Sequence, residues 1–344
     1  NNVAIGVNSM LTATTAENNT AVGVNSLNLH TTGDGNVAVG YKALEASTTA
    51  GNNVAIGQQA LLLTTTGQNN VAVGALALDA NTTAGDNAAI GYAALGGNTT
   101  GASNVAIGHS ALLVNSTGAN NVAIGTQALK ANTTAGQNVA IGFGAGDSVT
   151  GSSSHNTFTG LYAGAYNTPT TTGARNIMYG AYAHASGGTV NDAHGFGYDI
   201  NCASGYTTLG NAGDDIRAAH GNVTWATVSD ERYKKDIVDS TAGLSFINAL
   251  KPRTFKYKNL GELPNTFNDY EADSTDVFKN SNTNHGFIAQ EVKAAIDADS
   301  GIKNGFRLWD DRPDGSQEVA EAALIPVLVK AIQELSAEIE ILKA

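Results

Sequence analysis

The chain begins with a short pattern of apolar and polar residues that returns at a constant interval. A segment close to Asn-Val-Ala-Ile-Gly recurs, and its final glycines follow one another in steps of 17 residues from Gly6 to Gly142. Two variable residues, an Ala-Leu pair, a threonine-rich stretch and another glycine usually follow. Self-similarity at a fixed period predicts an array of stacked structural repeats.

Within each repeat the spacing predicts one short strand and one bend. Val3 and Ile5 are two residues apart, so on a strand they face the same side, and Ala4 faces the other. We expect stacked Val and Ile columns to form a continuous apolar core, with the small alanine permitting close approach of a neighbouring layer. Gly6 suits a bend that a Cβ would hinder. β-branched residues, Gly and Asn dominate without a 3.6-residue period, which disfavours a helical solenoid.

Residues 1–142 resemble a known architecture. The pattern Asn-x-Ala-Ile-Gly-x-x-Ala-Leu, present at Asn53–Leu61, is similar to the repeats of trimeric autotransporter adhesin heads (YadA-like). The resemblance implies a left-handed parallel β-roll, or β-solenoid, built as a homotrimer of parallel protomers.

After Gly142 the repeat becomes irregular. Gly160, Gly180 and Gly197 end similar segments at steps of 18, 20 and 17 residues. We therefore expect an irregular β continuation of the fibre over residues 143–228. Its aromatic residues are expected to cap and widen the core, and a sugar-binding surface is the alternative. These residues are Phe143, Phe158, Tyr162, Tyr166, Tyr179 and Tyr182.

Charge and composition divide the chain near Ser229. Residues 1–228 carry 10 acidic and 4 basic side chains, whereas residues 229–344 carry 20 and 14. The net charge of −12 and the lack of a basic stripe argue against nucleic-acid binding. We expect no membrane insertion, since no apolar run is long enough to span a bilayer. The aspartates and histidines of the fibre lack ligand spacing, so no metal or other cofactor is expected.

Three blocks mark the C-terminal part. They are the Ser-Asp-x-Arg-x-Lys motif of Ser229, Asp230, Arg232 and Lys234, the segment His285–Glu291, and the helical segment Ala331–Leu335. In this order they resemble the endosialidase-type C-terminal intramolecular chaperone, a serine autopeptidase domain of phage tailspikes and tail fibres. The resemblance predicts a small α+β chaperone domain over residues 229–344.

The resemblance also implies self-cleavage of the Val228–Ser229 bond by a serine–lysine dyad. Ser229 would be the nucleophile and Lys234 the base. A serine hydroxyl needs a base, and a lysine is neutral near pH 7 only when burial lowers its pKa. The two residues are five apart, so the pair needs a bend or a lysine from another protomer. The alternatives are a helix cap at Ser229 and a solvated charge at Lys234.

The other residues of these blocks have open roles. Asp230 and Arg232 are expected to hold the local geometry by pairing and hydrogen bonding. His285 is the only histidine after residue 229, and it could stabilise the cleavage reaction, donate a proton or be structural.

The C-terminal segment predicts a coiled-coil helix. Its apolar residues alternate in steps of three and four, with Pro326 near the helix start where a missing N–H is tolerated. In isolation, a coiled coil with Ile at heptad position a and Leu at heptad position d favours two helices, but a trimeric fibre requires three. The seam consists of Ile325, Leu328, Ile332, Leu335, Ile339 and Leu342.

Together these features predict a mainly β fragment of a phage tail fibre or tailspike with its own assembly chaperone. The fibre would fold in the host cytoplasm, belong to the virion, be extracellular after release and bind a host cell-surface receptor, either a glycan or an outer-surface protein. One alternative is a trimeric bacterial surface adhesin, which would need an outer-membrane anchor after Leu342. Another is a glycan-degrading tailspike with a site in the fibre.

Overall fold

The computed structural model describes residues 1–151, 153–167, 169–212, 214–221, 231, 234–299, 302, 308–311 and 316–343. The chain divides into two compact units, Asn1–Ser229 and Asp230–Ala344, which are described separately below.

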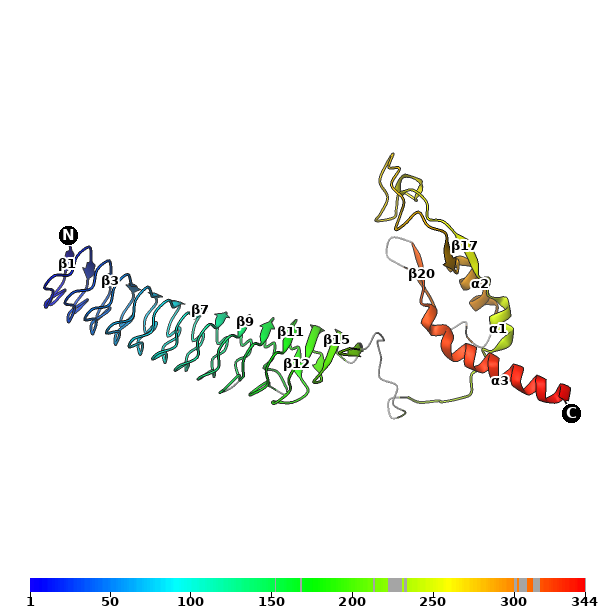
Figure 1. The fold of residues 1–344 in the computed structure, drawn as a ribbon, viewed down its shortest axis with the longest axis horizontal. Helices are drawn as coiled ribbons and strands as arrows, with labels where there is room; N and C mark the ends of the chain where they lie inside the picture. The colour runs from blue at the N-terminus through cyan, green and yellow to red at the C-terminus, as the bar shows by residue number, and fades with distance from the viewer. Residues whose placement is uncertain are drawn as a thin grey trace. The chain divides into compact units, whose positions relative to one another are not determined.

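The first unit is a β-solenoid in which each coil contributes one strand to a single 14-stranded sheet (Figure 1). Neighbouring strands are parallel, except for the last pair, β15 and β16, which is antiparallel. A second sheet pairs β12 (His184–Ala185) with β14 (Asn201–Cys202). The main sheet consists of β1 (Val3–Ile5), β2 (Thr20–Val22), β3 (Val37–Val39), β4 (Val54–Ile56), β5 (Val71–Val73), β6 (Ala88–Ile90), β7 (Val105–Ile107), β8 (Val122–Ile124), β9 (Val139–Ile141), β10 (Thr157–Thr159), β11 (Ile177–Tyr179), β13 (His194–Tyr198), β15 (Tyr206–Asn211) and β16 (Asp214–Ala219).

The register of the sheet confirms the stack of repeats predicted from the 17-residue period. Val54 pairs with Val71, and Ile56 pairs with Val73 in the next coil. Like residues therefore lie on like residues along the columns predicted from the sequence.

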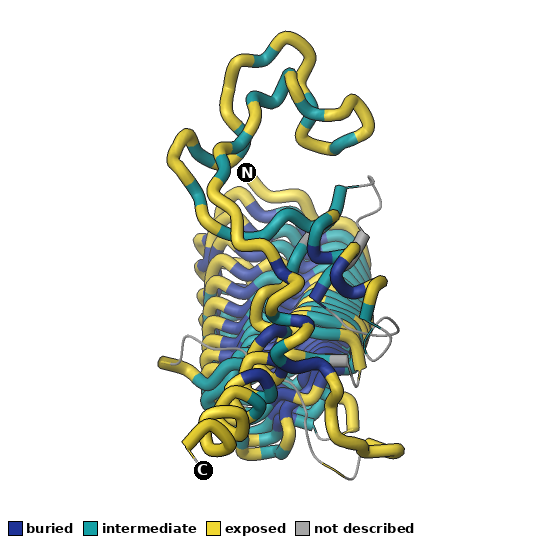
Figure 2. The backbone as a smooth tube through the Cα atoms, turned by 90° about the vertical axis from the view of Figure 1, so that its right-hand side faces the viewer, coloured by how far each residue is buried: buried dark blue, intermediate teal, exposed yellow. Residues whose placement is uncertain are grey.

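The side of the strand that faces inward was predicted wrongly. The central alanines, such as Ala55, are fully buried, whereas Ile56 is 41% exposed and Val71 is 37% exposed. The coil interior is narrow because Ala60 and Leu61 enter it from the following segment and are also fully buried. A methyl group fits opposite them, and the larger β-branched side chains are more exposed. Figure 2, coloured by burial, shows buried and exposed residues alternating around the coils.

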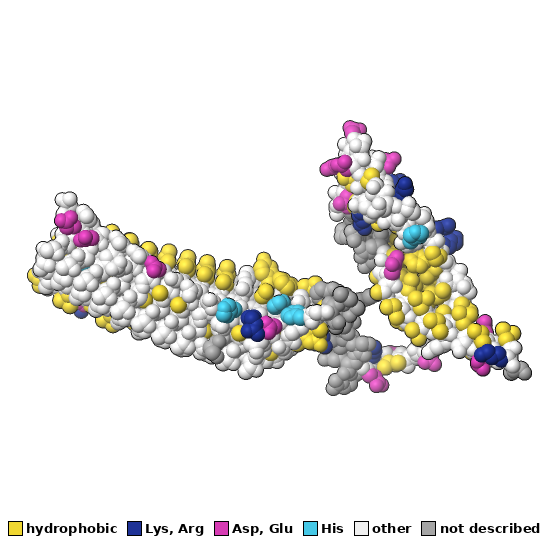
Figure 3. All heavy atoms as spheres, viewed as in Figure 1, with side chains coloured by type: hydrophobic (Ala, Val, Ile, Leu, Met, Phe, Trp, Pro, Cys, Tyr) yellow, Lys and Arg dark blue, Asp and Glu magenta, His cyan; other side chains and the backbone are white. Residues whose placement is uncertain are grey.

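We call the valine and isoleucine residues at the first and third positions of strands β1–β9 the Val/Ile stripe. A row of hydrophobic side chains follows the edge of the solenoid on which the strands lie (Figure 3). In the single chain this stripe is a long apolar surface feature and not the core.

The glycine after each strand has the expected role. Gly57 has φ of +140°, and a Cβ built on it would lie 2.5 Å from the carbonyl oxygen of Gly74 in the next coil. Only glycine combines this backbone conformation with such close stacking.

A buried ladder of asparagines joins the coils. The Nδ2 group of Asn121 donates to Oδ1 of Asn104 at 3.1 Å and to the carbonyl oxygen of Ala135 at 2.9 Å. Its Oδ1 accepts from the backbone N–H of Asn138 at 3.0 Å, so both ends of the amide are satisfied. The ladder consists of Asn19, Asn36, Asn53, Asn70, Asn87, Asn104, Asn121, Asn138, Asn156 and Asn176.

The irregular coils after Gly142 stay in the same sheet, and β10 and β11 pair in register. Phe158 is fully buried there, as expected for a widened core. Phe143, Tyr166 and Tyr179 are 43%, 39% and 58% exposed, so the expectation that the aromatic residues cap and widen the core is wrong for these three. Phe143 instead meets Tyr162 edge to face, with ring centroids 5.2 Å apart.

The second unit has an α+β composition, as predicted. Phe246 of α1, Val292 of α2 and Val327 of α3 share its hydrophobic core. The antiparallel hairpins β17–β18 and β19–β20 accompany the helices. The elements are α1 (Leu244–Ala249), β17 (Arg253–Phe255), η2 (Leu260–Glu262), β18 (Asn284–Gly286), α2 (Ala289–Ala298), β19 (Trp309–Asp311), β20 (Gln317–Val319), η3 (Glu321–Ala323) and α3 (Leu324–Lys343).

Among the described residues, no helix combines the length and the apolar character that crossing a membrane requires.

Candidate functional site

Most of the predicted cleavage segment falls outside the described residues. This holds for both residues of the predicted scissile bond, Val228 and Ser229, and for Asp230 and Arg232. Lys234 is described, and its side chain is exposed. Its backbone N–H donates to the carbonyl oxygen of Glu231 at 2.9 Å.

His285 lies on β18, opposite Thr254 of β17. Its Nδ1 is 3.3 Å from Oγ1 of Thr254, and the residue is exposed. The antiparallel pairing therefore places this histidine on the hairpin surface, where it contacts a hydroxyl group. Its participation in cleavage stays a prediction.

The block His285–Glu291 connects β18 to α2 and is anchored at both ends. Phe287 packs against the core of the unit. Glu291, in the first turn of α2, forms a two-pronged ion pair with Arg253 of β17, with distances of 2.9 Å from Nε to Oε2 and 2.5 Å from Nη2 to Oε1. This guanidinium holds the pKa of Glu291 below its ordinary value. The glutamate of the motif thus ties the hairpin to the helix.

The block Ala331–Leu335 lies within α3 and connects it to α1. Oε2 of Glu334 accepts a hydrogen bond from the backbone N–H of Leu244, the first residue of α1, at 2.7 Å. A Cβ on Gly243 would meet this carboxylate, so a larger residue just before the helix would displace the flexible end of the Glu334 side chain. Glu334, 90 residues later in the sequence, therefore caps the N-terminus of α1 by accepting a hydrogen bond from a backbone N–H that has no partner within the helix.

Sequence reasoning did not find Arg253 or Gly243. Arg253 is 38 residues from Glu291, and no local spacing relates the two. Gly243 stands alone in the sequence, and its closeness to the Glu334 carboxylate becomes visible only when α3 is packed against α1.

A comparison with known protein families matches part of this unit. Residues 229–300 match the family Peptidase S74, described as chaperone of endosialidase. The match contains the first two sequence blocks and starts at the residue where the two compact units meet. No curated protein and no solved structure matches the chain.

The Peptidase S74 match ends before α3, which carries two apolar faces. Leu324, Val327 and Ala331 are buried in the core of the unit. On another face, Ile325 and Ile332 of the predicted seam are 62% and 64% exposed. The predicted helix is confirmed, and its seam is open to solvent in the single chain.

The fibre unit holds little reactive chemistry. Among the described residues, no group of three or more His, Cys, Asp or Glu side chains could hold a metal ion. Burial raises the pKa of the Cys202 thiol to about 12, which keeps it protonated and unreactive.

His30 has a clear structural role in the fibre. It is fully buried, with Nε2 2.6 Å from the carbonyl oxygen of Gly33 and Nδ1 3.1 Å from Oγ of Ser47. Burial lowers its pKa, so the neutral ring is the stable form, donating through Nε2 and accepting at Nδ1. The sequence spacing alone assigned it no role.

Proposed function

We propose that this chain is a segment of a phage tail fibre or tailspike whose C-terminal domain directs homotrimer assembly and then removes itself by cleavage. The observation that carries the proposal is the Peptidase S74 match at residues 229–300, directly after a β-solenoid. A peptidase family described as a chaperone supports both self-cleavage and assembly in general terms. The serine–lysine dyad and the trimer are the finer parts of the proposal.

Two exposed apolar surfaces support assembly. The Val/Ile stripe runs along the solenoid, and the α3 seam exposes a second set of isoleucine and leucine side chains. Extended apolar surfaces of this kind mark protein interfaces. Each coil repeats the same contacts, so chains could associate in a register shifted by one coil. A C-terminal domain that first brings the chain ends together would prevent such a shift.

Cleavage would follow assembly because Lys234 is exposed in the single chain. A solvated lysine amine is a poor base for a serine hydroxyl, and burial favours the uncharged amine. We infer that packing of the chaperone domains in the trimer buries Lys234 beside Ser229. The neutral amine then takes the Oγ proton of Ser229 as this oxygen attacks the carbonyl carbon of Val228.

The remaining steps balance the reaction. The Val228–Ser229 C–N bond breaks, the proton passes to the departing amine of Ser229, and an ester links Val228 to Oγ. Water hydrolyses this ester and leaves a carboxylate on Val228. The fibre is then separated from its chaperone and is trapped kinetically in the folded state.

The test is expression of the chain with Ser229→Ala, Lys234→Ala or Lys235→Ala. The parent and Lys235→Ala should give two fragments, and N-terminal sequencing of the smaller one should begin at Ser229. The other two variants should stay at the full mass of about 35 kDa while still forming trimers by light scattering. A different new terminus, or continued cleavage of Ser229→Ala, would refute the dyad.

We also propose that the chain folds in the host cytoplasm, that the cleaved fibre joins the virion, and that after release it binds a host cell-surface receptor. The fibre itself supports this role, since a long, stiff solenoid presents repeated surface positions to a partner.

A further inference from the structure

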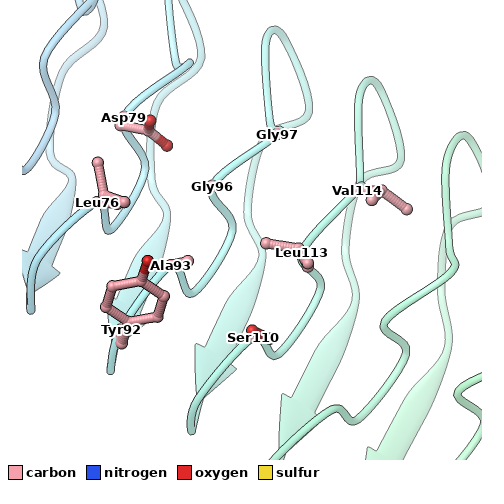
Figure 4. Close-up of a pocket in the computed structure, with 9 residues that line it drawn as sticks. All are labelled: Leu76, Asp79, Tyr92, Ala93, Gly96, Gly97, Ser110, Leu113 and Val114. Carbon is pink, nitrogen blue, oxygen red and sulfur yellow. The ribbon is translucent and has the colours of Figure 1, made fainter.

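One coil of the solenoid lacks side chains where its neighbours carry them. Gly96 and Gly97 stand at the positions that hold Asp79 and Ala80 one coil earlier, and Leu113 and Val114 one coil later. The missing side chain of Gly96 leaves a groove of about 600 Å³ between the flanking coils, and Figure 4 shows the residues that line it. At Gly97 the next coil packs closely, since a Cβ there would lie 2.9 Å from the carbonyl oxygen of Leu113.

The size of this groove limits what can enter it. It spans two coil spacings, or roughly 10 Å along the fibre axis. A helix with its side chains is about 10–12 Å across and would not fit. One or two sugar rings would fit, and the volume is within the usual range of roughly 300–1,000 Å³ for small-ligand sites.

An aromatic ring and apolar side chains line the groove. Tyr92 is 52% exposed, and its ring stacks on His109 with centroids 5.3 Å apart. One coil earlier the same position holds Ala75, so no aromatic residue stacks on Tyr92 from that side. Leu76 and Leu113 add apolar surface to the wall. These groups suit the C–H face of a ligand that also carries polar substituents.

The polar part of the groove centres on a carboxylate. Asp79 lies at the rim, and its Oδ1 would be 3.2 Å from a Cβ placed on Gly96. Burial raises the pKa of Asp79, and the opposing interactions come from backbone N–H groups and not from a cation. Two carboxylate oxygens with no charged partner are suited to accept hydrogen bonds from neighbouring hydroxyl groups.

We propose that this groove binds a saccharide unit of the host surface, with the sugar ring against Tyr92 and two of its hydroxyl groups on Asp79. The described residues that line it include no lysine or arginine, which disfavours an anionic ligand. The proposal rests on the proposed receptor-binding role for its biological meaning, while the binding chemistry follows from the groove alone.

The experiment uses the full chain and saturation-transfer NMR with a panel of methyl glycosides of glucose, galactose, N-acetylglucosamine and rhamnose. At least one glycoside should receive saturation on its ring protons. Asp79→Asn should weaken its binding roughly tenfold, as expected for loss of charge-assisted hydrogen bonds. Gly96→Leu, which introduces the residue found at Leu62 and Leu113, should abolish binding.

Asp147→Asn is the matched control, because Asp147 occupies the same coil position as Asp79 but lies outside the groove. It should leave glycoside binding unchanged. Absence of binding by every glycoside, or binding that survives Gly96→Leu, would overturn the proposal. Cleavage after Val228 is scored in the same samples, so failure of the groove is distinguishable from failure of the proposed function.

Discussion

Replacing Asn121 by aspartate tests the buried amide ladder with an almost isosteric change. The substitution exchanges Nδ2, which donates to Asn104 and Ala135, for an oxygen that faces the same two acceptors. The other oxygen can still accept from the backbone N–H of Asn138. The change therefore affects only the two hydrogen bonds that Nδ2 donates.

The expected cost follows from the protonation state. An ionised carboxylate facing two buried acceptors is strongly disfavoured, so the introduced carboxyl should fold in its protonated form. Keeping a group with an ordinary pKa near 3.9 protonated at pH 7 costs about 4 kcal/mol. Its O–H restores one hydrogen bond, and loss of the other adds about 1 kcal/mol. The total is about 5 kcal/mol at pH 7.

The same reasoning predicts a pH dependence. The folded pKa of the introduced carboxyl is raised, so its penalty grows as the pH rises above the unfolded value and largely disappears near pH 4. Asn120→Asp is the control, because Asn120 is adjacent but exposed. Guanidinium unfolding of both variants from pH 4 to pH 8, at one protein concentration, measures the difference. Equal midpoints for the two variants at pH 7, or a pH-independent loss in Asn121→Asp, would refute the reasoning.

Three further outcomes are expected. Burial lowers the pKa of His30. The stability that the neutral ring provides is therefore present above pH 6.5 and is lost as the pH falls through the folded pKa. His30→Asn should make the unfolding midpoint less dependent on pH. Ile56→Asp should leave the single chain folded but prevent trimer formation in sedimentation velocity, since Ile56 is 41% exposed and belongs to the Val/Ile stripe. The control Gln58→Asp should still form trimers. Glu334→Ala should lower the stability of the C-terminal unit by about 1 kcal/mol in thermal unfolding, as loss of a helix cap does, and Glu338→Ala should have no comparable effect.

The repeat period predicted the register of the sheet because stacking like on like requires only a constant spacing. It did not predict which face of each strand is buried. Ala55 and Ile56 are both apolar, and alternation shows only that they point to opposite sides. The inner side is decided by the width of the coil, which depends on Ala60 and Leu61 entering from the other side. A charge introduced at Ile56 would therefore lie at the surface of the single chain and not in its core.

The asparagine ladder shows a similar limit. A repeated asparagine beside a glycine is typical of turns. Nothing in one repeat reveals that its amide reaches the coils on both sides.

In the C-terminal unit the sequence blocks located the matched region, but not the contacts that hold it together. Glu291 and Glu334 were visible as motif residues, while their partners Arg253 and Leu244 lie far away in the sequence. Gly96-Gly97 was different, since a break in a regular repeat is visible in the sequence itself. Its meaning as a groove depends on which coil positions point outward, and this is decided by the folding of the coil.

The coil-to-coil hydrogen bonds have a mechanical consequence, because they lie along the long direction of the solenoid. Tension on the fibre would load these bonds one after another, while the covalent chain continues from coil to coil. Peeling one coil from the stack would exchange a rise of roughly 5 Å for an extended segment of roughly 60 Å. The solenoid would thus lengthen in discrete steps under force, absorbing work before the chain is drawn taut.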